Sequence, residues 1–129
     1  MNNYYQFARF AIVGIIGFVV DVSVLYIALH FGLEHWQGRA VSFLCAVLTT
    51  WVINRQLTFT AHKDMPILEE AIRYLVAMSL GGIVNYVTYL FVLIQFQTFQ
   101  LLPLIGVAVG SVAGMCFNYF SAKIWVFKL

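Results

Sequence analysis

Charged residues are scarce in this sequence: only 9% of its 129 residues are Asp, Glu, Lys or Arg, whereas 63% are hydrophobic. A soluble domain carries about 25% charged residues, so this chain has too little polar surface for water and we expect an integral membrane protein. The seven Lys and Arg residues form no basic patch of the kind that binds nucleic acid. Cys45 and Cys116 both lie in apolar runs, where packing is expected rather than a disulfide or a metal site.

The sequence also lacks the motifs of an active site. It has no nucleophile elbow, no phosphate-binding glycine loop and no spacing of metal ligands. The histidines, His30, His35 and His62, are isolated from one another along the chain. We therefore expect neither an enzyme nor a resident cofactor.

Four apolar stretches are long enough to cross a membrane as helices, since a span needs about 20 residues. No charged residue lies between Arg73 and Lys123, a run too long for one span, and glutamines and a proline at residues 95–103 mark its turn. The segment around Asp64 and Pro66 is typical of the start of a helix that lies at the membrane interface. We predict an all-α integral membrane protein with helices at residues 9–29, 39–59, 73–94 and 104–125.

Basic residues are distributed unevenly between the two sides of these predicted helices. Every lysine and arginine except Arg39 falls on the side that the two termini share with the middle segment. Because positive residues remain in the cytoplasm, we expect one orientation, with both termini cytoplasmic.

The first and third predicted helices match each other at a constant offset, and the second and fourth match at a slightly different one. Two hairpins of the same orientation form a parallel repeat, and transporters often bind their substrate between such repeats. We predict one domain over residues 1–129, with repeat halves at about 9–59 and 73–127. The matched pairs are Arg9 with Arg73, Phe10 with Tyr74, Gly17 with Gly81, Asp21 with Asn85, Arg55 with Lys123 and Phe59 with Phe127.

Small and polar residues recur at every fourth position of the second and fourth predicted helices. Such stripes let helix backbones approach closely and place amides between helices. Packing accounts for the glycines, while the asparagines can also line a path. The stripes are Ser42, Ala46, Thr50 and Asn54, and Gly106, Gly110, Gly114, Asn118 and Ala122.

Asp21 is an acid inside the first apolar stretch. It lies twelve residues after Arg9, which places its carboxylate about 18 Å deeper, near the middle of the bilayer. Insertion of an acid there costs about 2.5 to 3.5 kcal/mol, so an unpaired Asp21 is a functional candidate. The alternative is a hydrogen bond to a neighbouring helix that only fixes packing.

Four basic residues end or begin the predicted helices at one level, on the side of the termini. They can be plain membrane anchors, or they can form a basic rim that binds the phosphate of an anionic lipid, since arginine contacts phosphate oxygens bidentately. These residues are Arg9, Arg55, Arg73 and Lys123.

These motifs resemble the GtrA-like membrane proteins over nearly the whole chain. The resemblance rests on Arg9-Phe10 followed by Gly14, Gly17 and Asp21, on the sequence NRQLTF at residues 54–59, and on KIWVF at residues 123–127. It implies movement of a polyprenyl-phosphate-linked monosaccharide, such as undecaprenyl-phosphate glucose, to the outer leaflet of a bacterial cytoplasmic membrane for cell-surface polysaccharide modification. Related modules anchor dolichol-phosphate-mannose-type synthases. The repeat departs from symmetry where Ala122 matches Asn54 and Leu57 matches Trp125.

Three functions follow as hypotheses. In the first, a flippase, the basic rim captures the lipid phosphate, while Asp21, Asn54, Asn85 and Asn118 line the path of the sugar. In the second, residues 60–70 bind a cytoplasmic glycosyltransferase and nothing is transported. The third, a small proton-coupled exporter of cations, is disfavoured by the strong charge bias. Because four packed helices enclose little space, we expect a sugar path between protomers or along a lipid-facing groove, and a homo-oligomer, a dimer.

Overall fold

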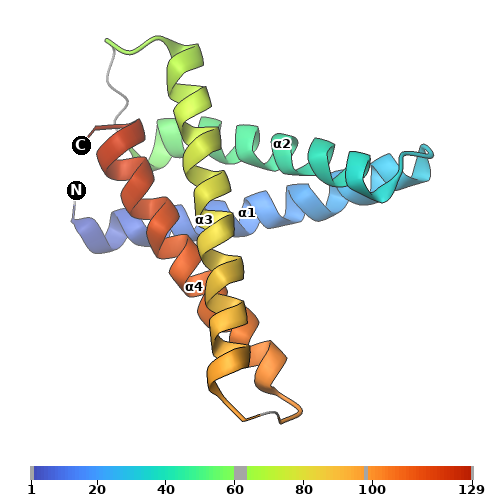
Figure 1. Ribbon diagram of the computed structural model, residues 1–129. Coiled ribbons are helices and arrows are strands. Elements are labelled where there is room, and N and C mark those ends of the chain that lie inside the picture. Colours follow the sequence, from blue (N-terminus) through green and yellow to red (C-terminus); the bar gives the residue numbers. More distant parts are fainter. Residues whose placement is uncertain (1, 60–63, 98, 129) are drawn as a thin grey trace.

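The computed structural model describes residues 2–59, 64–97 and 99–128, and over these residues the chain is helical and contains no strand (Figure 1). Four helices in this part of the chain are long and apolar enough to cross a membrane. The predicted all-helical membrane fold is thus confirmed. The elements are α1 (Asn3–His30), α2 (His35–Ile53) with a π-helical turn η1 (Asn54–Thr58), α3 (Ile67–Gln95), and α4 (Leu102–Ser121) with a π-helical turn η2 (Ala122–Val126).

All four helices begin earlier than predicted, α1 and α3 by six residues each. α1 starts at Asn3 instead of Arg9, and the side chain of Asn2 accepts a hydrogen bond from the backbone N–H of Tyr4. α3 starts at Ile67, directly after Pro66, and continues unbroken to Gln95. The predicted helix start near Asp64 and Pro66 is thus confirmed, but this helix is not separate, because it continues into the third predicted span. His62 and Lys63 lie outside the described residues.

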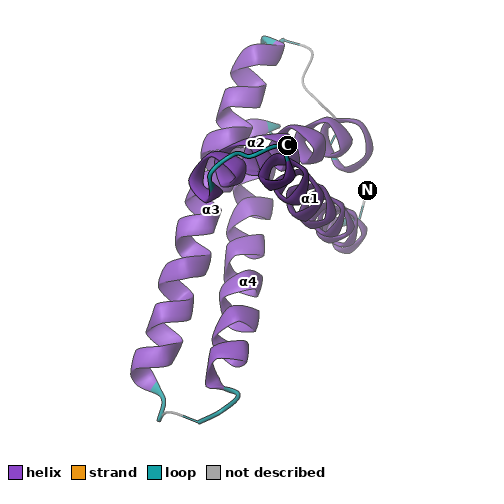
Figure 2. Ribbon diagram, turned by 90° about the vertical axis from the view of Figure 1, so that its right-hand side faces the viewer, coloured by secondary structure: helices purple, strands orange, loops and turns teal. Residues whose placement is uncertain are grey.

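The helices form two antiparallel hairpins, α1 with α2 and α3 with α4. Figures 1 and 2 show that the hairpins diverge from one shared end, which carries both termini and the start of α3. At this shared end Lys123 Nζ donates a hydrogen bond to Asn3 Oδ1 over 2.8 Å. The two hairpin tips, at residues 31–34 and 96–101, lie apart from each other (Figure 1).

The π-helical turns place a phenylalanine at the end of each hairpin's second helix. The backbone N–H of Phe59 bonds the carbonyl of Asn54 and that of Phe127 bonds the carbonyl of Ala122, both at 2.8 Å. A π turn accommodates one extra residue and changes the direction of the side chains that follow. Sequence periodicity predicted plain α-helix at both places and missed these turns.

Equivalent contacts recur in the two halves, as the predicted parallel repeat requires. Arg9 Nη1 donates to the carbonyl of Leu57 at 2.9 Å, and Arg73 Nη1 donates to the carbonyl of Trp125 at 3.4 Å. Each arginine thereby satisfies a carbonyl at the end of the helix that pairs with its own, where the helix leaves acceptors unpaired. A second pair of equivalent hydrogen bonds joins Trp51 Nε1 to Glu70 Oε1 and Tyr119 OH to Gln6 Oε1.

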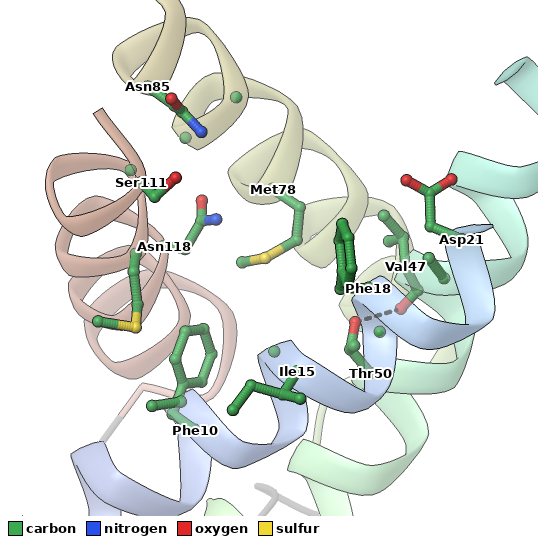
Figure 3. Close-up of a pocket in the computed structure, with 18 of the residues that line it drawn as sticks. Phe10, Ile15, Phe18, Asp21, Val47, Thr50, Met78, Asn85, Ser111 and Asn118 are labelled. Carbon is green, nitrogen blue, oxygen red and sulfur yellow. Dashed lines mark hydrogen bonds between the residues drawn. The ribbon is translucent and has the colours of Figure 1, made fainter. Parts of the chain in front are cut away.

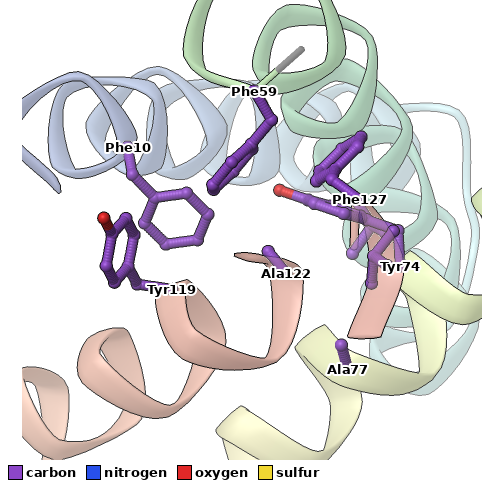
Figure 4. Packing of buried hydrophobic residues seen from close by; sticks show 9 residues of the cluster. Phe10, Phe59, Tyr74, Ala77, Tyr119, Ala122 and Phe127 are labelled. Atoms are coloured by element: carbon purple, nitrogen blue, oxygen red, sulfur yellow. The ribbon is translucent and has the colours of Figure 1, made fainter. Parts of the chain in front are cut away.

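An aromatic cluster, consisting of Phe10, Phe59, Tyr74, Tyr119 and Phe127, holds the two hairpins together at the shared end (Figure 4). Phe59 and Phe127 stack with ring centroids 4.7 Å apart. Phe10 packs edge-on against Phe59 as Tyr74 does against Phe127, at 6.0 and 6.1 Å. All five side chains are buried, so this cluster is the core of the molecule.

Glycines bring α3 and α4 into close contact. A Cβ added at Gly110 would lie 2.6 Å from the carbonyl oxygen of Asn85, and one at Gly114 would lie 2.9 Å from the carbonyl oxygen of Gly81. Such distances are too short for any side chain, so only glycine permits this packing.

Candidate functional site

A cleft of about 530 Å³ lies between the two hairpins (Figure 3). All four helices line it, and Phe10 and Tyr74 of the aromatic cluster close it toward the shared end. The cleft is open and not enclosed, because the hairpins diverge instead of packing as a closed bundle. This agrees with the expected groove, and the expected dimer stays a prediction. Most of the lining is apolar, and its polar side chains are Asp21, Thr50, Asn54, Tyr74, Asn85, Ser111 and Asn118.

Three of the predicted path residues are asparagines that the structure brings to this cleft. Asn85 and Asn118 lie with Ser111 on the wall formed by α3 and α4 (Figure 3). Asn54 lies deeper, where its Nδ2 donates to the hydroxyl of Tyr74 at 2.8 Å.

Two acceptor oxygens in the cleft have no partner. Oδ1 of Asn54 and Oδ1 of Asn118 are buried and receive no hydrogen bond from any described residue. A buried acceptor without a partner costs about 1 to 3 kcal/mol. Both oxygens are buried, that of Asn118 against Gly81, so a hydroxyl group of a ligand can bond them only after the amide groups rotate toward the cleft.

Asp21 lies on the opposite wall of the cleft (Figure 3), and it is not unpaired as the sequence suggested. Nη1 of Arg39 donates to both of its carboxylate oxygens, at 3.2 and 3.0 Å. The carboxylate is 19% exposed and the arginine side chain 54% exposed. Because α1 starts at Asn3, Asp21 also lies past the midpoint of the helix, toward the hairpin tip.

Arg39 is a site residue that sequence reasoning missed, because it stood out only as the single basic residue on the far side. The pairing of α1 with α2 in one hairpin could have predicted this contact. Asp21 precedes the end of α1 by nine residues and Arg39 follows the start of α2 by four, depths of about 14 and 6 Å below the tip. A long arginine side chain covers that difference.

The predicted basic rim gathers at the shared end, but none of its four residues lines the cleft. Each is held by a neighbour. Arg55 Nε pairs with the buried carboxylate of Glu70 at 2.9 Å, and Arg73 pairs with Glu69. Of the aromatic cluster, Phe10 and Tyr74 reach the cleft, whereas the rim residues next to the cluster do not.

The four rim residues differ in how far their charge is compensated. Arg55 and Arg73 each have a carboxylate partner. Arg9 and Lys123 donate to neutral acceptors, the carbonyl of Leu57 and the side-chain oxygen of Asn3. Arg9 and Lys123 thus retain a net positive charge that an anion can neutralise.

Comparison with known proteins matches this architecture to one family. The sequence profile described as "GtrA/DPMS, transmembrane domain" matches residues 9–127, which include both hairpins, the cleft and the aromatic cluster. The chain belongs to this family. A Bacillus subtilis (strain 168) protein described as "Uncharacterized membrane protein YngA" is 24% identical over 120 residues, which cover 92% of this chain and 77% of that protein. Both findings support a multi-pass membrane protein whose fold is a membrane domain and not a catalytic one.

The two halves of this GtrA-like chain are not equivalent around the cleft. Asn54 has an amide near the cluster where the repeat-matched Ala122 has only a methyl group, and Asp21 has a charge where Asn85 has none. A ligand in the cleft therefore meets two chemically different walls.

Proposed function

We propose that this protein moves a polyprenyl-phosphate-linked monosaccharide from the cytoplasmic to the outer leaflet of a bacterial cytoplasmic membrane. The observation that supports this most is the cleft, which lies between two repeated hairpins and has unpaired acceptors in its wall. Its volume of about 530 Å³ is within the range of small-molecule sites, about 300 to 1,000 Å³. The sugar occupies the cleft while the prenyl chain stays in lipid, so the cost of crossing falls on the headgroup alone.

In this mechanism the cleft replaces water around the sugar. When their amides rotate toward the cleft, Asn54 and Asn118 accept hydrogen bonds from sugar hydroxyls through Oδ1, and Asn85 offers a further amide. Because buried polar groups without partners are costly, these bonds lower the barrier that the apolar membrane interior imposes on the sugar.

The rim residues Arg9 and Lys123 capture the phosphate at the shared end, because their charges lack a carboxylate partner. The aromatic cluster then has to separate so that the headgroup can enter the cleft. Transporters built from repeats open by rocking one repeat against the other, and the same motion of the two hairpins would separate the cluster. In this proposal, a packed cluster corresponds to a state of the transporter that is closed at the cytoplasmic end.

Reconstitution in liposomes tests the proposal. Purified protein should accelerate the transbilayer movement of a labelled polyprenyl-phosphate glucose, and an unchanged rate of exchange would refute transport. Two serine variants provide a matched comparison. Ser111→Leu fills the cleft and should slow movement, whereas Ser79→Leu should not, because Ser79 lies outside the cleft and bonds the Leu75 carbonyl of its own helix.

The same assay separates the alternative functions. If the protein only binds a glycosyltransferase, both serine variants should be inactive in liposomes like the wild type. Replacing residues 60–66, which precede α3 and leave the buried Glu70 in place, with a neutral linker should then abolish the association. The proton-coupled exporter is opposed by Arg39, whose positive charge beside Asp21 repels a cationic substrate.

A further inference from the structure

The geometry of the Asp21–Arg39 ion pair leaves most of the arginine free. Only Nη1 of Arg39 contacts the carboxylate, and its Nε and Nη2 have no hydrogen-bond partner among the described residues. The side chain is 54% exposed. The guanidinium group is therefore fixed at one nitrogen and open on its other edge, beside the cleft that Asp21 lines.

The second hairpin serves as an internal control for what this ion pair does. Its repeat-matched positions are Asn85 and Val107, which line one hollow of about 330 Å³ together with Gly82, Tyr86 and Tyr89. This hairpin forms the same antiparallel pair of helices with no charge at either position. The architecture thus does not require the ion pair.

Arg39 also has a distinct location. Among the described residues it is the only lysine or arginine near a hairpin tip. The cleft extends from Asn54 near the shared end to Asp21 at the opposite side. A phosphate that leaves the rim residues and crosses the cleft therefore meets Arg39 as the next cation.

We propose that Arg39 is the phosphate ligand at the receiving end of the cleft, and that Asp21 positions it and keeps its affinity low. The proposal rests on the proposed function. The free edge of a guanidinium group offers two parallel N–H donors that fit two phosphate oxygens. Asp21 holds this group at the cleft, and its negative charge lowers the affinity of the same guanidinium group for a second anion. Weak binding at the receiving end favours release of the lipid.

A double-mutant cycle tests this assignment in nanodiscs. Binding of farnesyl-phosphate glucose is measured for the wild type, Arg39→Ala, Asp21→Asn and the double variant, with farnesyl glucoside, which has no phosphate, as the second probe. Arg39→Ala should weaken phosphate-lipid binding about tenfold or more, and Asp21→Asn should tighten it by a similar factor. The double variant should behave like Arg39→Ala, and no variant should change binding of the neutral glucoside.

Other outcomes overturn the assignment. Unchanged or weaker phosphate-lipid binding in Asp21→Asn would show that Asp21 does not restrain Arg39, and equal losses for both probes would show that Arg39 acts only through structure. If Arg39→Ala leaves Asp21 uncompensated and does not fold, comparison of the double variant with Asp21→Asn gives the same answer. Val107→Ala, at the repeat-matched position, should change neither probe.

Kinetics give an independent readout. In liposomes Asp21→Asn should lower the maximum rate of movement while it lowers the lipid concentration for half-maximal rate, because release becomes slow. A wild-type protein that moves no lipid would refute the proposed function, yet the binding cycle would still decide whether Arg39 is a phosphate site.

Discussion

The two hairpins share one set of contacts at the end where they meet and differ where they diverge. At the shared end Arg9 and Arg73 bond equivalent carbonyls, and the stacked Phe59 and Phe127 come from equivalent π turns. Along the cleft, the first hairpin has an ion pair and the second has an asparagine and packed glycines. The repeated contacts therefore define the fold, whereas the differences define the site.

The largest expected effect comes from giving the second hairpin the acid of the first. Asn85→Asp places a carboxylate opposite Val107, where no arginine can pair with it, and should destabilise the protein by up to about 3 kcal/mol. Adding Val107→Arg should restore much of this stability. Thermal unfolding in detergent measures both, and a stable Asn85→Asp single variant would show that position 85 tolerates charge without a partner.

The close packing of the second hairpin is tested by giving it the residue that the first has at the same position. Gly110→Ser, matched to Ser42, would place Cβ 2.6 Å from the Asn85 carbonyl oxygen. We expect a loss of about 1 to 3 kcal/mol of stability, because the opposing atom belongs to the backbone and cannot rotate away. Gly14→Ala is the control, since nothing lies within 4 Å of its added Cβ. Equal stability of the two variants would contradict the role assigned to the glycines.

The two repeat-matched arginines should differ in lipid capture. Arg9→Ala should raise the apparent lipid concentration for half-maximal transport about ten- to a hundredfold, as expected for one lost charged contact of about 1.5 to 3 kcal/mol, and more lipid should partly restore the rate. Arg73→Ala should have a smaller effect, because Glu69 already compensates its charge. Transport measured over a lipid titration distinguishes them, and equal losses would mean that compensation by Glu69 is irrelevant.

The smallest effect should follow from making the first half more like the second. The guanidinium carbon of Arg73 lies 5.8 Å from the ring centroid of Trp125, whereas Arg9 has the exposed Leu57 at the matched position. Leu57→Trp should therefore add a cation–π contact worth about 0.5 to 1 kcal/mol. A small rise in the unfolding temperature that disappears in an Arg9→Ala background would verify it; a rise that persists would assign the gain to burial alone.

Much of this fold can be predicted from the amino-acid sequence alone. Apolar stretches of membrane length predicted four spanning helices, and the matches between residues such as Arg9 and Arg73 predicted two equivalent hairpins. The helices and the repeat are local or periodic properties of the chain, so they can be recognised without knowledge of tertiary contacts. The helix starts at Asn3 and Ile67 were missed because aromatic and polar residues near an interface are compatible with either helix or loop.

The sequence by itself determined the membrane class, the four helices, the repeat and the candidates Asp21, Asn54, Asn85 and Asn118, because composition and spacing fix what a segment can do in lipid. Only the tertiary structure decided that these side chains share one cleft, that Arg39 pairs with Asp21, and that the rim residues do not line this cleft. These facts depend on the angle between the hairpins and on π turns near Phe59 and Phe127. Both arise from packing between distant segments, which no local pattern records.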